Sequence, residues 1–117
     1  MRETEMRKLL DELAADASAR LAAIDADLEE LRADRRGDQA DDEHDPEGAT
    51  LSAEWSRLAG LRDEIAREQH DIDAAFARWE AGEFGVCEDC GKPIPVGRLR
   101  ARPTATRCVA CAERAGG

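Results

Sequence analysis

The chain has 117 residues, of which 38% are charged and only 3% aromatic, and it contains no tyrosine. A single compact core would need more bulky apolar side chains, whereas long helices with a narrow apolar seam would not. The net charge of −10 argues against a general DNA-binding or RNA-binding protein and against an anionic membrane surface as partner. No apolar stretch reaches the ~18 residues of a membrane helix, so we expect a cytoplasmic protein.

Charge is divided unevenly along the chain. Residues 1–82 carry 11 basic and 23 acidic side chains, and residues 83–117 carry 6 basic and 4 acidic ones. The composition therefore predicts a boundary near Gly82, between an acidic segment 1–82 and a slightly basic segment 83–117.

A first long helix is predicted over most of the first 36 residues. Its apolar positions are spaced by three or four residues, which is a heptad seam with one stutter. Two arginines followed by Gly37 predict the end of this helix, because basic residues favour the last turn and glycine the position after it. The seam consists of Met6, Leu10, Leu13, Ala17, Leu21, Ile24, Leu28 and Leu31.

A second long helix is predicted to begin at Pro46, with Asp45 as its N-cap. Its seam has the same spacing, and the helix is predicted to close at Gly82. The seam members are Leu51, Trp55, Leu58, Ile65, Ile72, Phe76 and Trp79.

Two helices joined by a short loop form an antiparallel coiled-coil hairpin most simply. This arrangement sets Leu28 near Leu58, Leu21 near Ile65, and Met6 near Trp79. We expect a monomer, with pairing of exposed heptads between chains as the alternative.

The tip of this hairpin, residues 38–49, is strongly acidic. Residues 38–47 read DQADDEHDPE, with six acids and no basic residue. Like charges this close repel one another and contribute nothing to folding. Either the acids serve a partner, or the segment is a solvated loop that keeps the protein soluble.

Four cysteines form two C-x₂-C pairs, Cys87 with Cys90 and Cys108 with Cys111. Two such knuckles complete a tetrahedral Cys₄ shell without an open position, which is the structural type of zinc site. Iron in the same shell and a thioredoxin-like redox pair are the alternatives, although the redox pair needs an α/β context that this chain lacks. We therefore predict one structural Zn²⁺ in a small finger over residues 83–117, and a mainly α fold overall.

The finger is too short to bury a large core, so metal binding should supply much of its stability. Its arginines are interpreted as a basic face beside acidic helices or as a protein-docking patch, since no aromatic residues alternate with them to stack bases. The predicted core of the finger consists of Phe84, Val86, Ile94, Val96, Leu99 and Val109.

The segment FGVCEDCGKPIPVGRLRARPTATRCVAC, residues 84–111, resembles the zinc finger of the DksA/TraR family of bacterial RNA polymerase-binding transcription factors. The resemblance extends over both knuckles, the stretch from Ile94 to Pro103, and the length and tip charge of the hairpin. It implies a regulator that is neither an enzyme nor a direct DNA or RNA binder. Its coiled coil would enter the secondary channel of RNA polymerase, and acids at its tip would modulate initiation near the catalytic Mg²⁺.

Counting back from Cys87 places the functional tip of the family on Asp45, Glu47 and Ala49. The family pattern is Asp-x-x-Asp-x-Ala, whereas this chain reads DDEHDPEGA with further acids at Asp41 and Asp42. Which carboxylates act, and whether the alarmone ppGpp is required, is left open. The alternative function is a zinc-capped coiled-coil scaffold that binds another protein.

Overall fold

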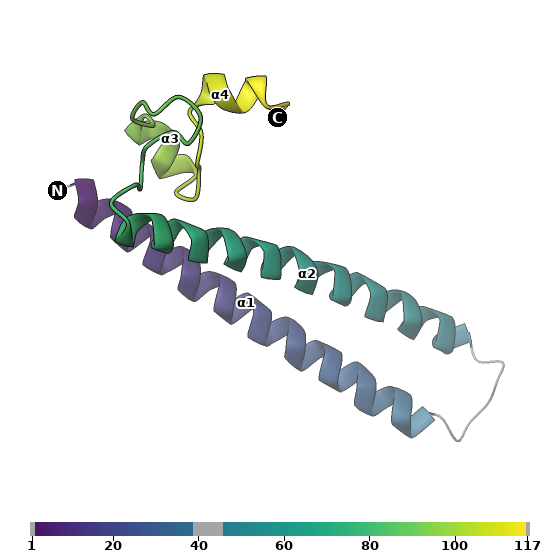
Figure 1. Ribbon diagram of the computed structural model, residues 1–117. Coiled ribbons are helices and arrows are strands. Elements are labelled where there is room, and N and C mark those ends of the chain that lie inside the picture. The colour runs from purple at the N-terminus through teal and green to yellow at the C-terminus, as the bar shows by residue number, and fades with distance from the viewer. Residues whose placement is uncertain (1, 39–45, 117) are drawn as a thin grey trace. The chain divides into compact units, whose positions relative to one another are not determined.

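The computed structural model describes residues 2–38 and 46–116. Within these ranges the elements are helices: α1 (Arg2–Asp38), α2 (Pro46–Glu80), α3 (Val96–Ala101) and α4 (Val109–Arg114) (Figure 1). The described residues also include an isolated antiparallel bridge between Val86 and Pro93. No helix in these ranges is long and apolar enough to cross a membrane.

The ends of the long helices test the capping arguments. Helix α2 begins at Pro46, as predicted, while its predicted N-cap Asp45 lies outside the described residues. Helix α1 continues through Gly37 to Asp38, so the predicted stop at Gly37 is wrong. One glycine within a helix costs only about 1 kcal/mol relative to alanine, and it ends a helix only when it adopts a left-handed conformation.

Gly82 does adopt that conformation, with φ of 74°, and ends α2. The N–H of Glu83 donates to the carbonyl of Arg78 at 2.8 Å, and the N–H of Gly82 donates to that of Trp79 at 3.1 Å. These two bonds form a Schellman motif, which satisfies carbonyls that the end of a helix leaves without intrahelical donors. The predicted close of α2 is confirmed.

The described chain divides into two compact units, one made of residues 1–15 and 69–117 and the other of residues 16–68. In the second unit α1 and α2 pack antiparallel, since Arg20 pairs with Glu68 and Asp25 with Arg62. Its buried seam residues are Ala17, Leu58 and Ile65. The specific pairing of Leu28 with Leu58 stays a prediction.

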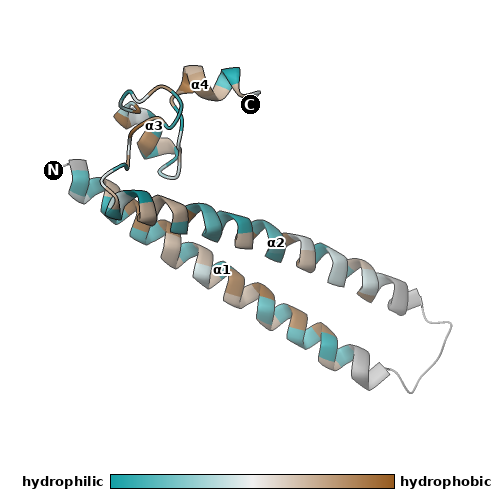
Figure 2. Ribbon diagram, viewed as in Figure 1, coloured by the Kyte–Doolittle hydropathy of each residue, from teal (hydrophilic) through white to brown (hydrophobic). Residues whose placement is uncertain are grey.

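In the first unit the start of α1 packs against the end of α2. The seam residues Met6, Leu10 and Ile72 are buried there, and Met6 and Trp79 belong to one hydrophobic cluster, as predicted. Both helices alternate hydrophobic and hydrophilic residues along their length (Figure 2), as expected for a narrow seam. The mainly α fold, a helical hairpin followed by a Cys₄ finger, is confirmed.

The core of the finger differs from the prediction at two valines. Ile94 and Leu99 are buried, but Val86 is 37% and Val109 49% exposed. Side chains alternate across an extended segment, so burial of Cys87 directs Val86 outward. Val109 precedes Cys111 by two residues, about 200° around α4, and therefore faces away from the buried sulfur.

Candidate metal centre

The first knuckle is a tight turn between Cys87 and Lys92. The N–H of Gly91 donates to the carbonyl of Cys87 at 2.9 Å, and the N–H of Cys87 donates to that of Lys92 at 2.8 Å. Gly91 has a φ of 74°, a left-handed conformation that a residue with a Cβ adopts only at a cost. A glycine directly after the C-x₂-C pair is therefore needed to return the chain past the two sulfurs.

The second knuckle is formed where the chain enters α4. Cys108 is the N-cap residue in extended conformation, and Cys111 is the buried residue of the helix. The N–H of Ala112 donates to the carbonyl of Cys108 at 2.9 Å, which closes the first turn. One cysteine before the helix and one within its first turn can thus point to the same side.

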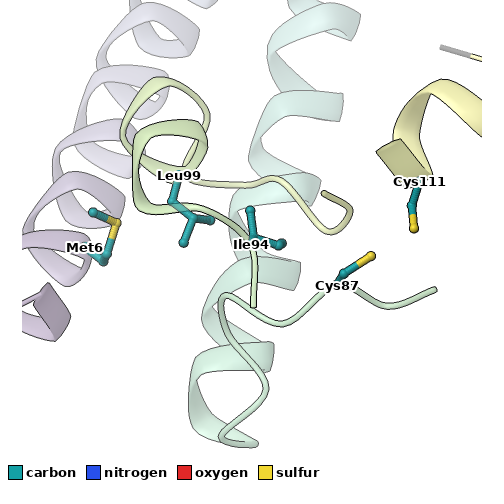
Figure 3. Close-up of a cluster of buried hydrophobic side chains, with 5 residues drawn as sticks. All are labelled: Met6, Cys87, Ile94, Leu99 and Cys111. Carbon is teal, nitrogen blue, oxygen red and sulfur yellow. The ribbon is translucent and has the colours of Figure 1, made fainter. Parts of the chain in front are cut away.

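The four sulfur atoms of Cys87, Cys90, Cys108 and Cys111 all lie within 4.8 Å of one another. The Sγ atoms of Cys90 and Cys108 are 3.9 Å apart, against the ~3.8 Å between sulfurs of a tetrahedral site with ~2.3 Å Zn–S bonds. The four cysteines are free thiols, and the sulfurs of Cys87 and Cys111 point toward each other (Figure 3). This donor set fits one zinc ion in a closed structural site.

The metal-free thiols differ in acidity. The backbone N–H groups of Cys90 and Cys108 donate to the Cys87 sulfur and lower the pKa of this thiol to about 6. A hydrogen bond from Arg114 is the largest single influence on Cys111 and lowers its pKa. Hydrogen bonding with Cys108, burial and the neighbouring thiols outweigh it and raise the pKa of Cys111 to about 11.

The centre is continuous with a hydrophobic cluster in the same compact unit. Cys87 and Cys111 are buried together with Met6, Ile94 and Leu99 (Figure 3). Burial of the two sulfurs therefore depends on α1 and α3 as well as on the knuckles.

The predicted basic face of the finger is largely engaged within the protein. Arg100 pairs with Glu5 at 2.6 Å, Arg107 pairs with Asp89 at 2.7 Å, and Arg98 donates to the carbonyl of Arg107 at 2.7 Å. These three side chains hold the finger together and to α1, which favours a structural role for them.

Arg114 was not singled out by the sequence. Its guanidinium donates to the Cys111 sulfur at 3.0 Å. The signal available beforehand was its position three residues after the ligand Cys111, because residues at that spacing share a face wherever the segment is helical.

The predicted tip residues are not tested by the structure. Asp41, Asp42 and Asp45 lie outside the described residues. Glu47 and Ala49 are within the first turn of α2, but their side chains also lie outside the described part.

Residues 82–115 match the model of the prokaryotic dksA/traR C4-type zinc finger. The RNA polymerase-binding transcription factor DksA of Caulobacter vibrioides is 45% identical over 65 residues, which cover 54% of this chain and 46% of that protein. The chain belongs to the DksA/TraR family. A structural zinc ion is accordingly the cofactor of its finger.

Two further relatives are similar to part of this chain. The DksA of Escherichia coli K12 is 36% identical over 75 residues, 63% of this chain and 50% of that protein. An uncharacterised 8.5 kDa protein of Escherichia phage 186 is 45% identical over 56 residues, 48% of this chain and 73% of that protein. The matched region thus spans about half the length of the DksA proteins.

The fold agrees with a solved structure of the family. Transcription factor DksA2 from Pseudomonas aeruginosa aligns with a TM-score of 0.83 at 25% identity, covering 97% of this chain and 82% of that chain. The likeness extends beyond the finger to the helices, where the family model has no match.

Proposed function

We propose that this protein regulates transcription by binding RNA polymerase, and that it does so without binding DNA or RNA itself. The observation that carries the proposal is the dksA/traR C4-type finger over residues 82–115, attached to two long helices of 37 and 35 residues. Relatives that share this finger are named RNA polymerase-binding transcription factors. The net charge of −10 also favours a protein partner over a nucleic acid.

In this proposal the finger over residues 83–117 is a rigid base for the hairpin over residues 1–82. Zinc held by Cys87, Cys90, Cys108 and Cys111 cross-links two knuckles, and the ion supplies binding free energy that stabilises the folded finger. The Glu5–Arg100 pair and the cluster around Met6 then join the finger to α1. The metal has a structural role and no role in a reaction.

The acidic tip over residues 38–49 is proposed to act inside the secondary channel of the polymerase. Carboxylates are hard oxygen ligands and interact favourably with Mg²⁺ and with basic side chains. Asp45 and Glu47, followed by Ala49, are the proposed acting residues, with Asp41 and Asp42 in a lesser role. Such a regulator would work as a monomer in the bacterial cytoplasm, where the polymerase acts.

Binding to purified core RNA polymerase tests the first half of the proposal. We expect the zinc-loaded protein to co-elute with the polymerase in size-exclusion chromatography and to compete with an authentic DksA for it. The substitution Cys90→Ser should weaken binding, because it opens the zinc shell at the base of the hairpin. Stable binding of a different partner, with no competition against DksA, would support a zinc-capped scaffold instead.

A further inference from the structure

The zinc centre poses an electrostatic problem. A zinc ion held by four thiolates has a net charge of roughly −2. Two of its sulfurs, those of Cys87 and Cys111, are buried in the hydrophobic cluster. Buried charge is costly unless hydrogen-bond donors or opposite charges compensate it, and such partners tune the affinity of a metal site.

The negative charges of the two buried sulfurs are compensated by different groups of the finger. Backbone N–H groups of the knuckles, those of Cys90 and Cys108 foremost, donate to Cys87. Cys111 instead receives a side-chain donor, the Nη2 group of Arg114, at 3.0 Å. A side-chain donor can be removed by a substitution that leaves the backbone unchanged, whereas the donors to Cys87 cannot.

Arg114 lies near other residues of the zinc centre as well as near the Cys111 sulfur. It is the last residue of α4 and lines a recess of about 290 Å³ together with Cys90, Cys111 and Asp89. Its charge also acts on Cys108 and Cys90. Arg114 therefore stands at the surface of the zinc centre where Cys90 is exposed to solvent.

A second arginine near the centre provides a contrast. Arg107 lies close enough to act on Cys87, but it pairs with Asp89 at 2.7 Å and with Glu88 at 3.0 Å. Two carboxylates thus offset its charge. Among the side chains that the structure describes, no carboxylate pairs with Arg114, so no ion pair offsets the attraction between its charge and the thiolates.

We propose that Arg114 is a positioning residue of the zinc centre: it orients and partly neutralises the Cys111 thiolate and slows both zinc loss and attack by thiol reagents. A hydrogen bond withdraws electron density from a thiolate and lowers its nucleophilicity. The guanidinium also hinders approach through the recess. This inference concerns the finger alone and does not depend on binding to RNA polymerase.

The experiment compares three variants of the full-length zinc protein. Arg114→Gln keeps most of the side-chain volume and a weaker neutral donor, and Arg114→Lys restores the charge. Arg100→Gln is the matched control, because Arg100 is an exposed finger arginine that pairs with Glu5 and not with a sulfur. The rate of zinc transfer to excess chelator is measured for each, together with the spectrum of the Co²⁺-substituted protein.

Changes of metal-ligand partners typically alter metal affinity by about 10- to 100-fold, so we expect Arg114→Gln to release zinc at least about 10-fold faster than wild type. Its thiolate-to-cobalt charge-transfer band should shift to longer wavelength, because the sulfur electrons lose a stabilising donor. Arg114→Lys should recover part of both effects, and Arg100→Gln, which contacts no sulfur, should leave the cobalt spectrum unchanged and speed zinc release far less than Arg114→Gln does.

Two results would overturn the proposal. One is an unchanged release rate and an unchanged cobalt spectrum in Arg114→Gln. The other is a faster release that Arg100→Gln matches with no spectral shift in either variant, because this would reflect general loosening of the finger. If Arg114→Gln fails to retain metal, the cobalt spectrum of Arg114→Lys decides: a band displaced from that of the wild type supports the proposal, and an identical band overturns it.

Discussion

The paired helices of residues 16–68 and the finger that follows α2 are stabilised by different means. In the helices a seam of small contributions is spread over many turns, with buried positions such as Leu58 and Ile65. In the finger four sulfurs within 4.8 Å concentrate the stabilisation on one ion. A single change in the seam removes part of the stability of the helices, whereas the loss of one ligand disrupts the Cys₄ centre as a whole, and this contrast leads to four predictions.

The largest expected effect is that of opening the zinc centre. Cys90→Ser, or full chelation, should unfold α3 and α4 but leave most helical signal, since these helices have 6 residues each against 37 and 35 in α1 and α2. The helical signal in far-UV circular dichroism should fall only slightly, and the NMR chemical shifts of the amides of residues 83–116 should move to values typical of an unfolded chain. An ordered finger after complete chelation would contradict the account.

A buried seam residue should have the next largest effect, and the effect should not depend on zinc. Leu58 is 3% exposed, and truncating a buried leucine to alanine costs about 2–5 kcal/mol. Urea unfolding of Leu58→Ala followed by helical signal should show this loss equally with and without chelator. The control Leu51→Ala, at a half-buried seam position, should lower the free energy of unfolding by less. If the loss of stability in Leu58→Ala disappeared on chelation, zinc would also stabilise the helices of residues 16–68, which would contradict the prediction.

The third prediction concerns protons displaced by zinc. A thiol binds zinc as thiolate, and the metal-free finger is expected to be unfolded, so its four thiols start near the ordinary cysteine pKa of about 8.5. At about pH 6 each thiol is protonated and releases a proton when zinc binds, whereas at about pH 9 most are already thiolates and release few.

Calorimetric zinc titrations in buffers of different ionisation enthalpy measure this count. Proton release should rise toward about four per zinc as the pH falls from about 9 to about 6, since the ordinary thiol pKa of about 8.5 lies between these values. The apparent zinc affinity should fall as the pH is lowered for the same reason. A count that stays constant across the range would show that zinc does not displace protons from the thiols.

The smallest effect belongs to the surface of the helices. Arg20 and Glu68 pair at 2.8 Å with both side chains more than a third exposed, and such pairs contribute about 0.2–1 kcal/mol, which salt reduces. Glu68→Gln should therefore lower the free energy of unfolding by less than about 1 kcal/mol. The difference from wild type should vanish in 1 M NaCl; a loss above 2 kcal/mol would show that the pair is more than a surface contact.

The same contrast explains what the sequence could predict. Heptad spacing predicts two long helices, and Pro46 and Gly82 mark the start and the close of the second one, because these signals are local. Paired C-x₂-C knuckles predict the zinc centre for the same reason, since the ligand spacing itself encodes the turn.

Features that depend on tertiary packing were missed or wrongly predicted from the sequence. The Glu5–Arg100 pair joins residues 95 positions apart, and the exposure of Val86 and Val109 follows from which neighbouring sulfur is buried. The stop at Gly37 failed because a glycine permits, but does not require, a left-handed conformation.

The central claim is that the acidic tip acts on the polymerase while the rest of the protein holds it in place. The measurement that tests it most directly is the lifetime of the promoter open complex with purified RNA polymerase, recorded together with polymerase affinity. Asp45→Asn with Glu47→Gln removes two charges with little change of volume and should cost only about 1 kcal/mol of helix stability. Asp41→Asn with Asp42→Asn is the control of equal charge change.

We predict that the Asp45/Glu47 variant binds the polymerase with unchanged affinity but no longer alters the open-complex lifetime, while the Asp41/Asp42 variant retains most of the effect. If the Asp45/Glu47 variant altered the lifetime as wild type does, these two acids would have no role at the polymerase, and the scaffold function would become the better account.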